Sequence, residues 1–193
     1  MAARILHGTQ LSLSIGLFGV IISLVLGIII GWISGYYGGA VDTVIQRIIE
    51  ILRSIPTIPQ WIALAASLPR TWNVIPIYLG ITVIISLYGW TDLARVSRGR
   101  FPAMREEDFI TAACLSGATD MRIIVRHMAP NSASHLIAAA SLAIPFMIVS
   151  ETTLSFLGLG LQAPAISWGV LLKAAQNVRT VASQSWMMIP VLP

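Results

Sequence analysis

The sequence predicts an all-α protein, a polytopic bundle of transmembrane helices. Of its 193 residues, 56% are apolar and only 10% are charged, whereas an ordinary soluble domain carries about 25% charged residues. So few charges cannot cover a water-exposed surface. Residues 11–34 form a continuous segment without a charged side chain. A helix of this length extends about 36 Å and crosses a hydrocarbon layer of about 30 Å with some tilt.

A second span is expected after a turn. The sequence Gly-Tyr-Tyr-Gly-Gly at 35–39 predicts a reversal of the chain, with two aromatic rings suited to the lipid headgroup region. An amphipathic helix follows from Val41. We expect it to kink at Pro56 and Pro59 and to continue as a span to about Ser67.

Two more spans and the start of a last one are expected further along the chain. Residues 74–96 predict the third span, and residues 133–150, which are rich in small side chains, predict the fourth. Pro145 should bend the fourth span. The apolar run at 186–193 would extend only about 12 Å as a helix. We therefore expect the last span to be truncated.

The distribution of arginine predicts the topology. Together with Arg95, the polar stretch 97–132 holds six of the twelve basic residues, and Arg47 and Arg53 raise the count on this side to eight. Cytoplasmic loops of membrane proteins carry an excess of Lys and Arg. The stretch 97–132 is therefore predicted to lie in the cytoplasm.

Residues typical of catalysis or of cofactor binding are few. The single cysteine, Cys114, excludes a disulfide framework, and the single lysine, Lys173, lies outside any phosphate-binding loop. The three histidines lack a second ligand at helical spacing, so no metal site and no cofactor are expected. Glu151 at a membrane boundary suits a local hydrogen bond or cap better than an ion relay. The modest net charge of +4 gives no indication of nucleic-acid binding.

The cytoplasmic stretch predicts two short helices. Residues 106–108 are acidic and suit the positive start of a helix, which Gly117 can close in a left-handed turn. Asp120 suits the start of a second helix, which should run to Met128 and stop at Pro130. Such a pair of helices forms either a protruding knob that fits a cleft in another protein or an interfacial helix that lies on lipid. The sequence pattern leaves both alternatives open.

Three motifs resemble the permease subunits of bacterial ABC importers, in the dipeptide and oligopeptide branch. The first resembles the EAA loop of that family and consists of Asp108-Phe109-Ile110-Thr111-Ala112-Ala113, Gly117-Ala118-Thr119-Asp120, Arg126-His127 and Pro130-Asn131. The second is Glu151 to Gly160 followed by Pro164 and Ser167-Trp168-Gly169, and the third is the turn at 35–39. The motifs follow one another in family order over nearly the whole chain.

This resemblance implies a multi-pass subunit of the bacterial cytoplasmic membrane. Its partners would be a second homologous permease, two cytoplasmic ATP-binding-cassette ATPases, an extracytoplasmic solute-binding protein and membrane lipid, with ATP hydrolysis on the ATPases. Residues 1–193 would form one transmembrane domain without the family's first helix and with a truncated sixth helix. Thr111 stands where the family has glutamate, so an ion pair of that glutamate with the ATPase is lost or replaced. The implied ATPase-coupling residues are Asp108, Phe109, Thr111, Ala112, Ala113, Gly117, Ala118 and Asp120.

The function implied by the resemblance is translocation of a small solute, di- or oligopeptides, through a channel opened by partner ATPases. The alternative is a subunit of an ion-coupled secondary transporter, which would require an unwound helix or buried carboxylates at mid-membrane. A third hypothesis, a membrane scaffold without transport activity, would not require the cytoplasmic knob. The sequence does not identify the substrate.

Overall fold

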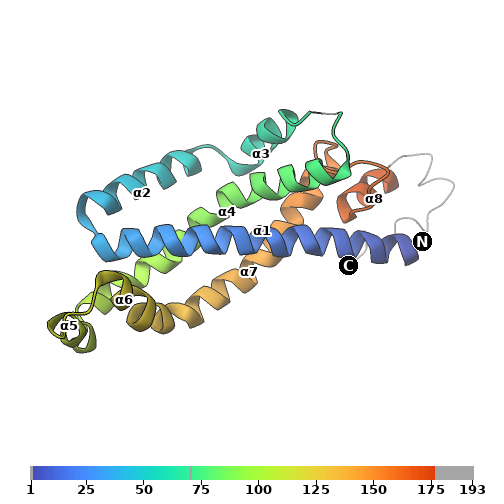
Figure 1. Ribbon diagram of the computed structural model, residues 1–193. Coiled ribbons are helices and arrows are strands. Elements are labelled where there is room, and N and C mark those ends of the chain that lie inside the picture. The colour runs from blue at the N-terminus through green and yellow to red at the C-terminus, as the bar shows by residue number, and fades with distance from the viewer. Residues whose placement is uncertain (1, 70, 177–193) are drawn as a thin grey trace. The chain divides into compact units, whose positions relative to one another are not determined.

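The computed structural model describes residues 2–69 and 71–176, and these residues confirm the all-α prediction. They contain no strand. The elements in chain order (Figure 1) are α1 (Ala2–Tyr37), α2 (Gly39–Ser54), α3 (Thr57–Ala66), α4 (Val74–Arg105), α5 (Asp108–Leu115), α6 (Asp120–Ile123), the π-helical turn η1 (Ile124–Met128), α7 (Ala129–Phe156) and α8 (Trp168–Ala175). The predicted last span at 186–193 lies outside the described residues.

Among the described residues, three helices are long and apolar enough to cross a membrane. They cover Ala3–Tyr37, Val74–Arg105 and Asp120–Phe156. The first, third and fourth predicted spans fall within these helices. Each helix runs well beyond the predicted span, because the polar residues that flank a span continue the same helix into the interface region.

The second predicted span is not one kinked helix. The chain breaks at Ile55, whose φ of −97° and ψ of 138° are extended, because the ring of a following proline disfavours the helical conformation of the residue before it. The two pieces, α2 with 16 residues and α3 with 10, would extend about 24 and 15 Å. Neither is long enough to cross a membrane alone.

The predicted turn at 35–39 is also shorter than expected. Gly35, Tyr36 and Tyr37 remain helical, and Gly38 alone separates α1 from α2. Gly38 and Gly39 have φ angles of 63° and 53°, values that glycine adopts without the steric cost of a Cβ. The reversal therefore needs two glycines rather than five residues.

The helix that was predicted to stop at Pro130 continues through it. η1 connects α6 directly to α7, and His127, which we expected near a helix end, lies inside this continuous helix. A π-helical turn is wider than an α-helical turn and accommodates the proline ring with its missing N–H. The side-chain amide of Asn131 donates to the His127 carbonyl oxygen at 2.8 Å. This bond supplies a donor to a carbonyl group of the π-helical turn.

The chain divides into two compact units, each with its own packing. Unit 1 comprises Met1–Val20, Pro56–Ser86 and Ile144–Pro193, and unit 2 comprises Ile21–Ile55 and Leu87–Ala143. The helices α1, α4 and α7 contribute residues to both units. The helices α3 and α8 belong to unit 1, and α2, α5 and α6 belong to unit 2.

In unit 2, α1 and α4 approach each other closely along a stripe of glycines. A Cβ placed on Gly27 or on Gly35 would lie 2.6 Å from the Cβ of Leu93 or of Phe101, and one on Gly31 would collide with the Ser97 hydroxyl. The Ser97 hydroxyl donates to the Gly27 carbonyl oxygen at 2.9 Å. Glycines spaced four residues apart allow such contact between membrane helices.

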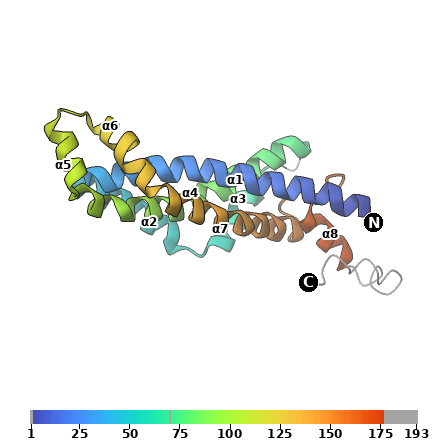
Figure 2. The same cartoon turned by 90° about the horizontal axis from the view of Figure 1, so that it is seen from below.

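In unit 1, hydroxyl groups connect the same two helices. Ser86 donates to the Gly19 carbonyl oxygen at 3.1 Å, and the Tyr78 hydroxyl donates to Ser14 at 3.1 Å. The helix α8 lies beside the first turns of α1 (Figure 1, Figure 2), where the indole N–H of Trp168 donates to Thr9 at 3.0 Å. The Ser86 bond is buried and the Tyr78 bond is partly buried, and both satisfy polar groups where an unpaired group is costly.

Candidate coupling site

The predicted knob is formed by α5 and α6, which lie side by side in both views (Figure 1, Figure 2). Asp108 opens α5, and its carboxylate suits the positive end of the helix. At the other end, Gly117 has a φ of 75°. The Gly117 N–H donates to the Cys114 carbonyl oxygen at 3.0 Å, and the Ala118 N–H donates to the Ala113 carbonyl oxygen at 3.1 Å. This pair of bonds defines a Schellman motif, so the predicted left-handed turn is confirmed.

A buried apolar cluster holds the knob in place. Ile110 and Ala113 form the inward face of α5, and Ala118 packs on the same cluster. Trp32 stacks on Phe101 with ring centroids 5.9 Å apart. The buried members of this cluster, which we call the knob core, are Phe101, Ile110, Ile123, Ile124 and Met128.

A polar contact fixes the start of α6. The Tyr36 hydroxyl donates to the Asp120 carboxylate at 2.8 Å. The guanidinium of Arg105 lies over the Tyr36 ring, 5.7 Å from its centroid, a distance that suits a cation–π interaction. The last turns of α1 and α4 are thus connected to α6 through one tyrosine.

The outward surface of the knob is apolar and unusually exposed. Phe109 is 42% exposed, Leu115 is 85% exposed and Met121 is 68% exposed. Of these three residues, Phe109 also lines a cavity of about 390 Å³, whose other lining residues are Ala112, Ala113, Ser116, Gly117, Ala118, Arg122 and His127. Large exposed apolar side chains that lie close together are typical of contact surfaces. We call this area the knob surface.

The structure separates the eight predicted coupling residues by position. Phe109, Ala112, Ala113, Gly117 and Ala118 line the same cavity. Asp108 and Thr111 are exposed on α5, and Asp120 is bonded to Tyr36. Their role in coupling remains a prediction.

Sequence reasoning missed three residues of this region. Tyr36 was assigned to a lipid headgroup turn, although its partner Asp120 lies 84 residues away, and no local pattern indicates such a pair. Leu115 and Met121 were given no role. No local pattern separates them from Ile110 and Ile123, which flank the same turn and are buried in the knob core.

The second motif, from Glu151 to Gly169, lies in unit 1 and contains a buried, hydrogen-bonded carboxylate. Glu151 is 0% exposed and accepts from Ser12 at 3.0 Å and from Ser155 at 2.7 Å. These bonds confirm that Glu151 has local hydrogen-bond partners. Gly158 has a φ of 80° just after the end of α7, and a Cβ on Gly169 would collide with the Thr152 carbonyl oxygen.

Comparison with known proteins gives the family. The family model of the binding-protein-dependent transport system inner membrane component matches residues 27–192. The chain belongs to this family. It is therefore an inner membrane transport component, in agreement with the three span-length helices found among the described residues.

Relatives of this inner membrane component agree with the resemblance found in the motifs. The chain is 38% identical to the oligopeptide transport system permease protein OppC of Escherichia coli (strain K12) over 189 residues, which are 98% of the chain and 60% of the relative. It is 34% identical to the dipeptide transport system permease protein DppC of Bacillus subtilis (strain 168), covering 95% of the chain and 55% of that relative. The chain thus spans less than two thirds of the length of these relatives.

A solved structure supports the fold of this family. An inward-facing conformation of the MetNI methionine ABC transporter matches with a TM-score of 0.70 and covers 99% of the chain and 87% of the solved chain. The sequence identity is 18%. The helical arrangement is therefore similar to that of the solved chain.

Proposed function

We propose that the chain is a channel-forming permease subunit of an ATP-binding-cassette importer and that the knob surface couples it to a cytoplasmic ATPase. The observation that carries this proposal is the exposed apolar surface around Phe109 and Leu115, held on the buried knob core. A side chain as exposed as Leu115 gains free energy when a partner covers it, about 25 cal/mol for each Å² of apolar area. Because the chain belongs to a family of transport-system membrane components, we expect this partner to be the ATPase of the same system.

The proposed cargo is a di- or oligopeptide. The two relatives described above carry these substrates in their names, and the chain aligns with them over nearly its whole length. The proposed assembly contains a second homologous permease, two ATPases and an extracytoplasmic solute-binding protein. The chain itself would not hydrolyse ATP.

The experiment is peptide uptake by the complete importer in proteoliposomes. We expect uptake to require ATP and to persist when ion gradients are collapsed. The substitutions Phe109→Glu and Leu115→Glu place a charge on the knob surface and should reduce co-purification of the ATPase and uptake together. The matched control is Ala103→Glu, at an exposed position near the end of α4, which should retain both.

Two outcomes would contradict the proposal. Uptake that follows an ion gradient without ATP would favour a secondary transporter. Normal ATPase binding in both knob variants would place the ATPase contact elsewhere.

A further inference from the structure

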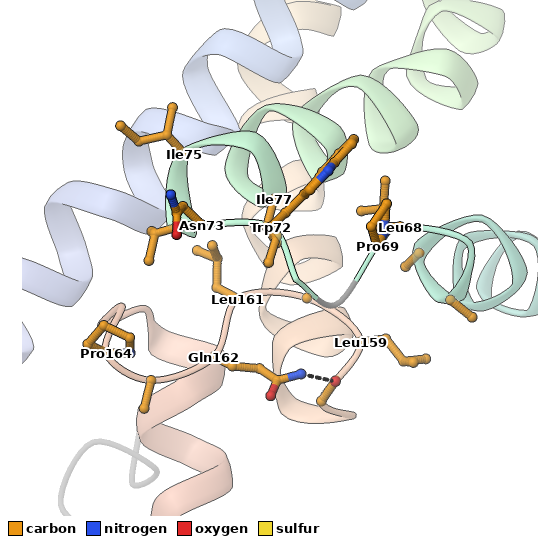
Figure 3. Close-up of a pocket in the computed structure, with 16 residues that line it drawn as sticks. Leu68, Pro69, Trp72, Asn73, Ile75, Ile77, Leu159, Leu161, Gln162 and Pro164 are labelled. Atoms are coloured by element: carbon orange, nitrogen blue, oxygen red, sulfur yellow. Dashed lines mark hydrogen bonds between the residues drawn. The ribbon is translucent and has the colours of Figure 1, made fainter.

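Two cavities of the structure differ in the charge of their lining. One lies in unit 1, between the connection from α3 to α4 and the loop after α7 (Figure 3), and has a volume of about 490 Å³. Its described lining residues are neutral. The other is the cavity of about 390 Å³ in unit 2, which we call the knob cavity, and two of its lining residues are basic, Arg122 and His127. The knob cavity is therefore the candidate site for an anionic group.

The π-helical turn η1 helps to place the two basic residues on one side of their helix. Arg122 and His127 are five residues apart, and in a regular α-helix a step of five residues leaves two side chains about 140° apart around the axis. A π-helical turn holds more residues, so each residue rotates the chain by a smaller angle. Both side chains accordingly line the knob cavity.

Neither basic residue forms an ion pair among the described residues. The three ion pairs found there belong to Arg47, Arg53 and Arg98. All eight Asp and Glu residues of the sequence lie within the described part of the chain, and unit 2 is described throughout. A guanidinium has five N–H donors and no acceptor. Those of Arg122 are thus available to a carboxylate from outside the chain.

The lining of the knob cavity is held in place before any partner binds. Four small residues, Ala112, Ala113, Gly117 and Ala118, leave the hollow open. Ala113 and Ala118 pack against the knob core. A preformed cavity lowers the cost of ordering on binding. Phe109 belongs both to this lining and to the knob surface, so a protein that covers the knob surface also reaches the cavity.

We propose that the knob cavity receives a carboxylate side chain of the cytoplasmic ATPase, which pairs with Arg122 and accepts a second hydrogen bond from His127. This inference rests on the proposed function and adds the chemistry of the partner, an Asp or Glu beside an apolar patch that covers Phe109. A guanidinium can bind a carboxylate through two parallel N–H···O bonds. Such a charge pair fixes the register in which the apolar surfaces dock.

The first test is titration of the purified ATPase onto proteoliposomes that contain the rest of the importer. Arg122→Gln should weaken ATPase binding roughly three- to tenfold, between the effects of an exposed ion pair and of a charge-assisted hydrogen bond. Binding should also depend less on salt in this variant, because salt screens a charge pair. Arg126→Gln is the matched control, since Arg126 is exposed on η1 and does not line the knob cavity. Thermal unfolding verifies that each variant is folded.

The second test identifies the partner group. In the complete importer with Arg122→Lys, a zero-length carbodiimide should join the introduced amine to a carboxylate in contact with it. Mass spectrometry should map this link to an Asp or Glu of the ATPase. Arg126→Lys is the matched control and should give no such link. The single lysine of the original sequence, Lys173, lies in unit 1 and does not line the knob cavity.

The outcomes separate this inference from the proposed function. Normal ATPase binding by Arg122→Gln, or the absence of a link from position 122 to an ATPase carboxylate, would overturn the inference. If Phe109→Glu and Leu115→Glu still lose the ATPase, the coupling proposal stands, whereas normal binding by these variants as well would overturn both. The competing anion is a lipid phosphate. If the effect of Arg122→Gln disappears in proteoliposomes of phosphatidylcholine alone, an anionic lipid occupies the cavity and the inference is wrong.

Discussion

Tyr36 in α1 and Asp120 at the start of α6 are joined by a hydrogen bond of 2.8 Å. Tyr36 also packs against the knob core, and the Arg105 guanidinium lies over its ring. The hydrogen bond therefore adds a polar contact to the apolar contacts that hold the knob. The start of α6 sets the direction in which the knob surface faces. A substitution at Tyr36 should therefore change the position of α6 while the side chains of the knob surface stay the same.

We predict that Tyr36→Phe lowers the free energy of unfolding by about 1 kcal/mol, the typical loss for one hydrogen bond, and reduces ATP-dependent uptake. Hydrogen exchange of α6 and uptake by the complete importer measure the two effects. Tyr37→Phe is the matched control, because Tyr37 is 54% exposed and has no such partner among the described residues. Equal effects of both variants would contradict a role of the Tyr36 bond.

A second prediction concerns the turn between α5 and α6. Gly117→Ala should destabilise the knob by about 1 kcal/mol or more, because a φ of 75° disfavours any residue with a Cβ. Gly99→Ala is the matched control. A Cβ at either position meets no atom within 4 Å, so only the backbone conformation differs, and Ala at helical Gly99 should gain up to about 1 kcal/mol.

The measurement is thermal unfolding together with ATP-dependent uptake. The bulkier variant Gly117→Val should uncouple the ATPase more strongly than Gly117→Ala, since β-branching adds strain at positive φ. If Gly117→Val transports normally, the turn has no part in coupling.

Local backbone structure was predictable from the sequence where the residues of one short segment determine it. The acidic start of α5, Gly117 and the start of α6 are all neighbours in the chain, and the turn they predict is present. Proline effects were less predictable. Pro102 lies inside α4, Pro130 is accommodated beside η1, and Pro56 breaks the helix instead of kinking it.

The reason is that tertiary surroundings decide what a proline does. A π-helical turn or a neighbouring side chain can replace the missing bond, and neither is visible in a local pattern. The contacts of the glycine stripe 27, 31, 35 could not be predicted for the same reason. Its partners Leu93, Ser97 and Phe101 lie about seventy residues away along the chain, so a periodic pattern on one helix does not identify the other helix.

A third prediction concerns the ion pair between α2 and α4 in unit 2. Hydrogen bonds from Arg98 lower the pKa of Asp42, with a smaller contribution from Ser34, although burial opposes the shift. Because the pKa in the folded protein lies below the ordinary value of 3.8, the pair stabilises the fold above that pH. The stabilisation is lost as the pH falls through the lowered pKa.

The measurement is thermal unfolding of the detergent-solubilised protein against pH. Asp42→Asn should be less stable than the original protein at neutral pH, and the difference should shrink as the pH falls below 3.8. Glu106→Gln, at an exposed position, should show no such convergence. A constant difference at all pH values would mean that Asp42 acts through packing and not through its charge.

The last prediction uses Cys114, the single cysteine of the sequence, as a reporter of the knob surface. Cys114 is exposed on α5, next to Leu115. A membrane-impermeant maleimide should label it only from the cytoplasmic face. If an ATPase covers the knob surface, labelling should fall when the ATPase is bound and recover when it is removed. A helix lying on lipid would instead label slowly in both states, because the departure of a soluble partner does not bring water to a residue against lipid. Cys114→Ser provides the background. Labelling from the outer face would contradict the topology predicted from the arginines. Labelling from the cytoplasmic face at the same rate with and without the ATPase would agree with the topology and contradict the coupling role.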